Sequence, residues 1–464
     1  MSESGSPLPS GRGAVSGAIP SFPLISRAPD DVVFRLPGEA ITTAMLLDAA
    51  HRLADILPDG AYVANLCRDR LWFAVALVAA MLREEITLLT SDRSPARLRA
   101  LAEDYPRLYL LTDEQLRGMP LDQHLLARSP LPVVRDAPAT PSVSAAQVAA
   151  IVFTSGSTGQ PLAHRKLWGA LVERSDDAAS RFGFTRSHPP SIVGMVPPQH
   201  MYGFETTVLL PMHAPATAWC GPAFYPQDVA AALRAVPEPR VLVTTPLQIR
   251  ALLRASAKLA TIDQVVSATA PLFGEMAEAA ERRWKTHVFE IFGATEVGSI
   301  ASRRTVADDV WHTYPRVRLS RDDAHAGRVS VHGPFAEPCA VNDVITYLDD
   351  QHFRLVGRAA DMVKLGGRRA SLAELTRILT EIEGVSDGQF IAPEDLDRRP
   401  TARLVAFAVA PQRTADEILS VLRSRIDPLF LPRRIILVDQ LPRNDVGKLT
   451  DQALGILRTQ IAGD

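Results

Sequence analysis

The chain has 464 residues, of which 47% are hydrophobic, and it carries a formal net charge of −2 at pH 7. A chain of this length is too long for one hydrophobic core, so we expect at least two domains. The near-neutral charge argues against nucleic acid as a partner, because nucleic-acid-binding surfaces usually leave a basic surplus.

The N-terminal segment is rich in Ser, Gly and Pro and lacks the basic start and apolar core of a secretion signal. We expect residues 1–22 to form a flexible tail. The longest apolar run, Leu71 to Leu82, is twelve residues long. A membrane span needs about 20 residues, so this run predicts a buried helix and no membrane span. Three scattered cysteines favour a reducing compartment, and we therefore expect a cytoplasmic protein.

Segments of helical length alternate with short apolar runs between about residue 33 and residue 358. Helices are predicted at Ala44–Ile56 and Leu71–Leu82. Buried strands are predicted at Thr87–Leu89, Leu108–Leu111, Val148–Phe153, Ser191–Val196, Val241–Thr244 and Val265–Ser267. This alternation predicts an α/β fold in which helices cover layered mixed sheets.

The pattern changes after a break near Gly357–Gly367. A helix (Ser371–Ile382), a strand (Leu404–Val409), a second helix (Ala415–Ile426) and a second strand (Arg434–Val438) are predicted there. About a hundred residues of mixed α and β suffice for a small domain. We therefore predict a large N-terminal domain over residues 23–357 and a small α+β C-terminal domain over residues 358–464.

The most informative stretch follows the strand predicted at Val148–Phe153. Its glycines allow a tight turn, and successive backbone N–H groups with hydroxyl donors can surround an anion. A strand that leads into such a loop suits the triphosphate of ATP. An ordinary Ser/Thr/Gly turn is the alternative, and the loop is not of the Walker type because no Gly-Lys-Ser/Thr ends it. The loop comprises Thr154, Ser155, Gly156, Ser157, Thr158 and Gly159.

Phe153 to Pro161, FTSGSTGQP, resembles the phosphate-loop signature of the adenylate-forming (AMP-binding) superfamily. This superfamily includes acyl-CoA synthetases, adenylation domains of peptide synthetases and firefly luciferase. Four further blocks match in the right order. The resemblance implies ATP and Mg²⁺ as cofactors and a small carboxylic acid as substrate. It also implies a C-terminal domain that moves as a lid.

Three of these blocks lie in the predicted large domain. In PPQHMYG, His200 stands where the family places a residue that guards the acid pocket. The resemblance places Phe292 and Gly293 of FGATE against the nucleotide, with the ring of Phe292 on adenine. It places Thr295 on the adenylate phosphate and Glu296 on Mg²⁺. Ser267–Leu272, SATAPL, resembles a strand of small residues lining the adenine pocket, which includes Ala268 and Ala270.

The resemblance also assigns residues on both sides of the predicted domain boundary. Asp343 and Arg358 would bind the ribose, since a carboxylate readily accepts hydrogen bonds from two hydroxyls. Lys448 would bridge the acid carboxylate and the α-phosphate as the adenylation lysine. In isolation each residue would be a solvated surface group, so its place in a block carries the assignment. The channel for the thiol would be formed by Gly366, Gly367 and Arg368.

Three departures from the family pattern bear on activity. The phosphate loop normally continues Pro-Lys-Gly, but here it continues Pro161-Leu162-Ala163. Arg165 and Lys166 are close enough in sequence to replace the missing lysine. The hinge position after Arg358 is Ala360 followed by Asp361, and Val341-Asn342 precedes the ribose Asp. A degenerate member that binds nucleotide without turnover is therefore an alternative.

The expected acid pocket offers Tyr, Thr, Phe and small residues, and no clear cation for a second carboxylate. We expect its walls at Tyr202–Thr207, Thr244–Leu247, Ser267–Ala270 and Phe292–Val297. A neutral acid fits such walls. The chain also resembles ligases of aryl-polyene (xanthomonadin) clusters, which load hydroxybenzoate-type starters onto acyl carrier protein. This favours an aryl acid, with a medium- or long-chain fatty acid as competitor. The acceptor is either CoA or the phosphopantetheine of an acyl carrier protein.

Overall fold

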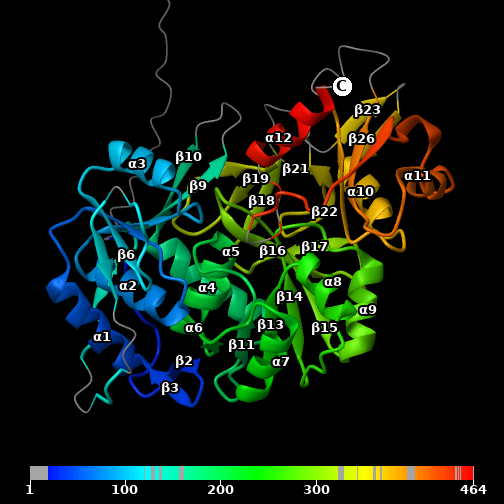
Figure 1. The fold of residues 1–464 in the computed structure, drawn as a ribbon. Coiled ribbons are helices and arrows are strands. Elements are labelled where there is room, and N and C mark those ends of the chain that lie inside the picture. Colours follow the sequence, from blue (N-terminus) through cyan, green and yellow to red (C-terminus); the bar gives the residue numbers. More distant parts are fainter. Residues whose placement is uncertain are drawn as a thin grey trace, which may run out of the picture.

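The computed structural model describes residues 19–119, 121–126, 131–134, 138–155, 161–321, 329–341, 343–358, 362–365, 368–393, 403–444, 447, 449 and 451–462. Two large sheets form its body (Figure 1). The six-stranded sheet has the order β10-β9-β5-β4-β6-β7, with all neighbours parallel except β10 and β9. Its strands are β4 (Tyr62–Asn65), β5 (Ile86–Leu89), β6 (Leu108–Thr112), β7 (Gln123–Leu125), β9 (Val148–Ser155) and β10 (Pro161–Leu167).

The second sheet has eleven strands in the order β21-β22-β17-β16-β15-β14-β13-β11-β12-β2-β3. It is parallel from β15 to β2 and antiparallel at both ends. Its strands are β2 (Val32–Leu36), β3 (Glu39–Thr42), β11 (Ser191–Gly194), β12 (Thr217–Trp219), β13 (Arg240–Thr244), β14 (Gln264–Ser267), β15 (His287–Ala294), β16 (Gly298–Arg304), β17 (Val310–Thr313), β21 (Asp343–Tyr347) and β22 (His352–Arg358). Smaller sheets pair β1 (Ser21–Pro23) with β8 (Ser142–Ser144), and β19 (Val329–His332) with β18 (Arg318–Arg321) and β20 (Cys339–Ala340).

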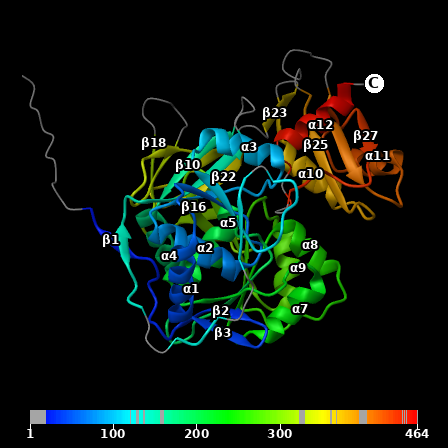
Figure 2. The same cartoon turned by 60° about the vertical axis from the view of Figure 1, so that its left-hand side comes forward.

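Helices cover both faces of each large sheet, as Figure 2 shows from a second direction. Because side chains alternate along a strand, Ile192 of β11 joins the central core while its neighbour Val193 joins the outer core. The helices between the sheets are α1 (Thr43–Ile56), α2 (Arg70–Leu82), α4 (Trp168–Phe182), α5 (Met201–Phe204), the π-helical turn η1 (Glu205–Leu209) and α6 (Leu210–His213). The outer helices are α3 (Pro95–Asp104) on the six-stranded sheet, and α7 (Pro226–Ala235), α8 (Pro246–Arg254) and α9 (Gly274–Trp284) on the eleven-stranded sheet. This arrangement confirms the predicted α/β fold of layered mixed sheets.

The C-terminal part has its own core and its own sheets. It comprises β23 (Met362–Leu365), β24 (Arg368–Ser371), α10 (Leu372–Thr380), β25 (Asp387–Ile391), β26 (Val405–Val409), α11 (Ala415–Arg423), the 3-10 turn η3 (Pro428–Phe430), β27 (Arg434–Leu437) and α12 (Asp451–Ala462). It contacts the body through α8 and the start of α9. Arg250 Nη2 donates to Thr380 Oγ1 at 3.2 Å, and the Arg377 guanidinium lies 5.4 Å from the centre of the Phe273 ring. The division at residues 357 and 358 remains a prediction.

The ends of some predicted elements differ from the structure. Ser21 and Phe22 were expected in the flexible tail, but they form the start of β1. The physical reason is that the Phe22 ring packs edge-on against Phe335, with ring centres 5.6 Å apart. Residues 1–18 lie outside the described part. Over the described residues, no helix has both the length and the apolar composition that crossing a membrane requires.

Candidate active site

The predicted phosphate loop is the connection of a β-hairpin. Strand β9 ends at Ser155 and β10 begins at Pro161, and these two residues face each other in an antiparallel register. The strand that leads into the loop is therefore present, and β9 anchors it to the parallel strand β5. The expected ligands Gly156, Ser157, Thr158 and Gly159 lie outside the described residues. The side chains of Thr154 and Ser155 are likewise not described.

The two predicted ribose ligands meet in the structure. Asp343 begins β21 and Arg358 ends β22, and the two residues are direct partners in the antiparallel register. The backbone therefore brings together two residues that the sequence separates by fifteen positions.

The predicted Thr295–Glu296 pair lies in the tight turn between β15 and β16. Val297 N donates to Ala294 O at 3.1 Å and closes this turn. A Cβ atom at Gly293 would lie only 2.6 Å from the carbonyl oxygen of Gly298, so the close approach of the two strands requires glycine there. Thr295 and Glu296 are both half-buried.

Glu296 has the chemistry that a magnesium ligand needs. Among the described residues, no ion pair or hydrogen bond engages its carboxylate. Mg²⁺ typically takes one or two carboxylates and fills its other positions with phosphate oxygens and water. A half-buried carboxylate at a turn fits this pattern, so the predicted metal role of Glu296 stays open as a prediction.

A buried lysine contacts the backbone of the same turn. Lys166 of β10 is 6% exposed, and its Nζ donates to the carbonyl oxygen of Glu296 at 2.7 Å. Burial lowers the pKa of Lys166 to about 8, while the negative charges of Glu205 and Glu296 act in the opposite direction. Lys166 therefore links the strand that leaves the phosphate loop to the Thr295–Glu296 turn.

Phe292 contributes to the aromatic core next to the turn. Its ring centre lies 5.6 Å from that of Trp311 and 5.4 Å from that of Phe353, and 9% of the residue is exposed. The ring thus has a structural role in any state of the site. Contact with adenine remains a prediction.

The small-residue segment SATAPL is mainly a loop, which corrects our expectation of a strand. Strand β14 ends at Ser267, and Thr269 has a left-handed backbone with φ of 79°. A residue in this region cannot continue a strand. The loop is held in place because Leu272 N donates to the buried Glu290 carboxylate at 2.7 Å. Ala268 is buried and Ala270 is exposed.

Two of the four expected acid-pocket walls meet at Tyr202, together with Val266, the residue before a third wall. Its hydroxyl lies 2.8 Å from Val266 O and 3.2 Å from Thr244 O, and it can donate to both carbonyls in a three-centre bond. Burial raises the pKa of Tyr202, so the hydroxyl stays protonated as a donor. His200 caps the N-terminus of the short helix α5, because its Nδ1 accepts from Tyr202 N at 3.2 Å. His200 therefore shapes the expected pocket, whatever its role in catalysis.

Replacing Tyr202 with Phe should destabilise the large domain by about 1–2 kcal/mol, since two buried carbonyls lose a donor. Urea denaturation followed by tryptophan fluorescence would measure this loss. Tyr225→Phe is the matched control, because Tyr225 is 65% exposed. Equal denaturation midpoints for the two variants would contradict the role of Tyr202 in joining the walls.

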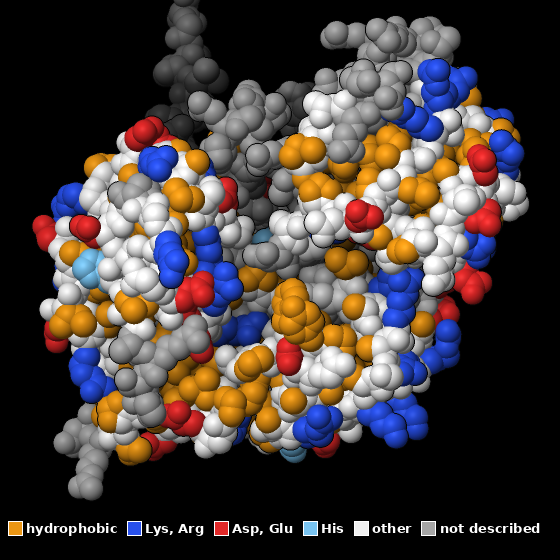
Figure 3. Space-filling model, viewed as in Figure 1, with side chains coloured by type: hydrophobic (Ala, Val, Ile, Leu, Met, Phe, Trp, Pro, Cys, Tyr) orange, Lys and Arg blue, Asp and Glu red, His pale blue; other side chains and the backbone are white. Residues whose placement is uncertain are grey.

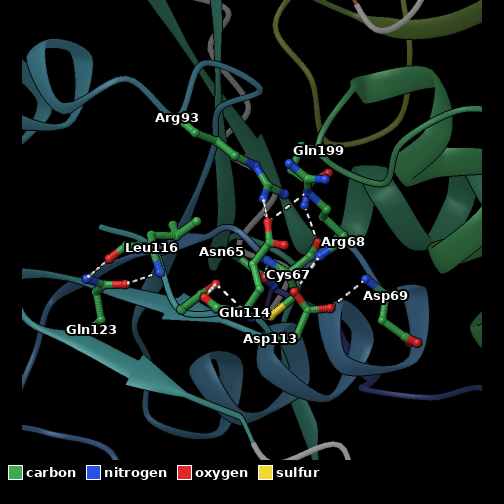
Figure 4. Close-up of polar contacts among 11 residues, drawn as sticks. Asn65, Cys67, Arg68, Asp69, Arg93, Asp113, Glu114, Leu116, Gln123 and Gln199 are labelled. Carbon is green, nitrogen blue, oxygen red and sulfur yellow. Dashed lines mark hydrogen bonds and ion pairs between the residues drawn. The ribbon is translucent and has the colours of Figure 1, made fainter. Parts of the chain in front are cut away.

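A polar network that sequence reasoning missed supports the PPQHMYG block (Figure 4). The Asp113 carboxylate accepts from Arg68 N at 3.0 Å and from Asp69 N at 2.8 Å, which ties the loop after β4 to the end of β6. The side-chain amide of Gln199 donates to the carbonyl oxygen of Cys67 in the same loop. The residue before His200 is thus fixed to the six-stranded sheet. No sequence motif marks these contacts.

The block predicted to carry the adenylation lysine lies against the expected acid pocket. Gly447 has φ of 77°, and a Cβ atom there would lie 3.0 Å from Leu247 Cδ2. Lys448 itself lies outside the described residues. Figure 3 shows a hollow between the body and the C-terminal part, and basic side chains gather along its rim. The segment before Lys448 thus lies beside a wall of the predicted site.

The structure places one of the three predicted thiol-channel residues. Arg368 lies at the start of β24 and forms an ion pair with Asp427 of the same C-terminal part. This pair is exposed, so it adds little stability. Gly366 and Gly367 lie outside the described residues. The thiol channel therefore remains a prediction.

Comparisons with known proteins assign the chain to a family of adenylate-forming enzymes. Residues 25–330 match the family described as AMP-binding enzyme, and the chain belongs to this family. A 4-coumarate–CoA ligase from Halorhodospira halophila is 28% identical over 310 residues, covering 64% of this chain and 73% of the relative. An indoleacetate–CoA ligase from Aromatoleum aromaticum is 26% identical over 365 residues, covering 70% of this chain and 69% of the relative.

Solved structures show the same fold. ATP-bound MatB from Rhodopseudomonas palustris superimposes with a TM-score of 0.77 at 19% identity, covering 95% of this chain and 98% of that chain. The anthranilate CoA ligase AuaEII in complex with anthranoyl-AMP gives a TM-score of 0.75 at 16% identity, covering 94% and 96%. The likeness spans both the body and the C-terminal part.

Proposed function

We propose that the chain is an AMP-forming acid–thiol ligase that activates a neutral aryl acid. The observation that carries the proposal is the hydrogen bond from Lys166 Nζ to Glu296 O, which joins the strand leaving the predicted phosphate loop to the turn predicted to hold magnesium. The backbone pairing of Asp343 with Arg358 and the contact of the Gly447 segment with Leu247 support it. Membership of the AMP-binding enzyme family supports the same reaction class.

The proposed reaction has two halves. A carboxylate oxygen of the acid attacks the α-phosphorus of ATP, the bond from that phosphorus to the bridging oxygen breaks, and pyrophosphate leaves. The sulfur of a thiol then attacks the acyl carbon, AMP leaves with the bonding electron pair, and the thiol proton is released. Asp343 and Arg358 would hold the ribose, Thr295 the α-phosphate, and Lys448 the charge that builds up between acid and phosphate. Mg²⁺ on Glu296 would neutralise phosphate charge.

A lid movement would separate the two halves. In the proposed sequence the C-terminal part rotates about the segment near Arg358, Lys448 leaves and residues 366–368 enter for the thiol step. Contacts such as Arg250 with Thr380, and Arg377 with Phe273, would have to break and re-form. Among the described residues these contacts are a side-chain hydrogen bond and a cation–π contact, which suits a joint that opens in every cycle.

An aryl acid is favoured by the walls and by the relatives. The wall residues Tyr202 and Thr244 are uncharged, Glu205 of the same wall is bound to Ser299, and Lys166 is bound to Glu296 O. Relatives named as 4-coumarate–CoA, indoleacetate–CoA and 4-chlorobenzoate–CoA ligases support an aromatic carboxylate. A hydroxybenzoate-type acid, as in aryl-polyene clusters, is our first candidate. The acceptor would be CoA or the phosphopantetheine of an acyl carrier protein.

A screen of pyrophosphate release with hydroxamate trapping tests the proposal. The panel should include hydroxybenzoates, cinnamates and C8–C16 fatty acids, each with ATP and Mg²⁺. Turnover with an aryl acid at least about tenfold above every fatty acid, as kcat/KM, would support it. Preference for a fatty acid would move the chain to the competing fatty-acyl ligase class.

The missing loop lysine favours one further alternative. Leu162 stands at that position and is 60% exposed, so it supplies no charge to the phosphates. Measurable ATP binding with no pyrophosphate release for any acid would support a degenerate nucleotide-binding member. It would also overturn the ligase proposal.

A further inference from the structure

Two buried, oppositely charged side chains approach the Thr295–Glu296 turn from separate elements. Lys166 comes from β10, directly beyond the phosphate-loop hairpin, and donates to Glu296 O at 2.7 Å. Glu205 comes from the π-helical turn η1, beyond the PPQHMYG block, and is 8% exposed. The turn thus has one support on the side of the phosphate loop and one on the side of the acid pocket.

The Glu205 carboxylate engages the backbone just after the turn. It accepts from Ser299 N at 3.1 Å and also from Ser299 Oγ. Gly298 makes room for this contact, because a Cβ atom there would lie 2.4 Å from Glu205 Oε1. The backbone at Gly298 has φ of 91°, which glycine alone adopts without strain. The local sequence is therefore suited to holding a carboxylate against the turn.

Glu205 is placed to support the turn and not to contact the acid. The cavity beside it, lined by Ser299, Tyr314 and Arg174 among others, has a volume of about 10 Å³. A space of that size holds at most one water molecule. π-helical turns often mark functional sites, and Glu205, the first residue of η1, brings a carboxylate to the interior.

We propose that Lys166 and Glu205 are positioning residues that together hold the Thr295–Glu296 turn in the geometry that Glu296 requires to bind magnesium. This inference rests on the proposed function. It also gives Lys166 a task different from replacing the missing loop lysine. Its Nζ hydrogen-bonds the turn at a backbone carbonyl, so its charge acts on the phosphates through the position of Glu296.

Two variants, one at Lys166 and one at Glu205, should distinguish a positioning role from a contribution to folding stability alone. Lys166→Met keeps the length of the side chain and removes the donor, and Glu205→Gln keeps its shape and removes the charge. We expect each to weaken binding of ATP in the presence of Mg²⁺ about tenfold, and to leave binding without Mg²⁺ within about twofold. Calorimetry with α,β-methylene-ATP, a non-reacting analogue, measures both values. Lys258→Met, at an exposed lysine, is the matched control.

Kinetic readouts add a second criterion. The KM for ATP and the Mg²⁺ concentration at half-maximal rate should rise, while the KM for the acid and thioester formation from supplied acyl-AMP stay within about twofold. Equal weakening with and without Mg²⁺, or an unchanged magnesium requirement, would overturn the inference. If Lys166→Met does not fold, Glu205→Gln alone decides by the same two measurements.

The failure of this inference can be told apart from failure of the proposed function. A wild-type protein that releases pyrophosphate, together with variants that bind Mg²⁺ and ATP as tightly as wild type, rejects the positioning role alone. A wild-type protein with no pyrophosphate release for any acid rejects the ligase proposal. In that case the positioning role fails as well, since it rests on the proposal.

Discussion

Replacing Lys448 with Ala should lower the rate of pyrophosphate release by about 100- to 1000-fold and leave thioester formation from supplied acyl-AMP nearly unchanged. The ammonium group would stabilise charge that builds up between the acid and the α-phosphate in the first half-reaction only. In the second half-reaction the proposed rotation has moved the lysine away. Rapid-quench measurement of each half-reaction with a purified acyl-AMP would test this split.

The structure supports the position of this block. Arg443 forms a two-pronged ion pair with Asp387, and its Nη1 donates to Gly447 O at 3.1 Å. The turn before Lys448 is therefore fixed to the core of the C-terminal part, so that it would move with this part as a unit. Lys258→Ala, at an exposed lysine of the body, should leave both half-reactions intact. Equal loss of both half-reactions in Lys448→Ala would argue against the rotation.

Sequence reasoning reached the parts of the site that are continuous in the chain. The strand leading into the phosphate loop and the helices α1 and α2 follow from local pattern. Thr295 and Glu296 were assigned through the family resemblance of a continuous block. The pairing of Asp343 with Arg358 could be expected only through the family resemblance, because register depends on long-range packing. The end of β14 at Ser267 was predicted correctly, but the strand expected for SATAPL was wrong, since the left-handed backbone of Thr269 is unusual for a β-branched residue.

The supports of the site could not be predicted from local pattern. The Lys166 contact spans 130 positions of the sequence and the Glu205 contact spans 94. A single charged residue next to an apolar segment is usually a solvated one, and Arg70 directly precedes the predicted helix Leu71–Leu82. Burial turns such residues into structural anchors, and burial depends on which elements pack together.

Arg70 carries the largest stability effect that we expect from a single change. Its Nη2 donates to Gly194 O at 2.5 Å and to Val196 O at 2.7 Å, and its Nε to Thr207 Oγ1 at 3.1 Å. These acceptors belong to the end of β11 and to η1, on either side of the PPQHMYG block. Arg70→Leu would leave several buried acceptors without a donor, so we expect a loss of about 3–5 kcal/mol.

Comparing Arg70→Leu with Arg70→Lys should show that the hydrogen bonds of Arg70, and not its charge alone, carry this stability. Arg70→Lys keeps the charge but cannot reproduce the planar fork, so its urea midpoint should fall between those of wild type and Arg70→Leu. Arg52→Leu removes an exposed helical ion pair with Asp48 and should shift the midpoint little. Because Arg70 fixes the strand end that leads to His200, Arg70→Lys should also raise the KM for the acid more than the KM for ATP. A midpoint for Arg70→Leu equal to that of Arg52→Leu would show that Arg70 is not an anchor of the acid pocket.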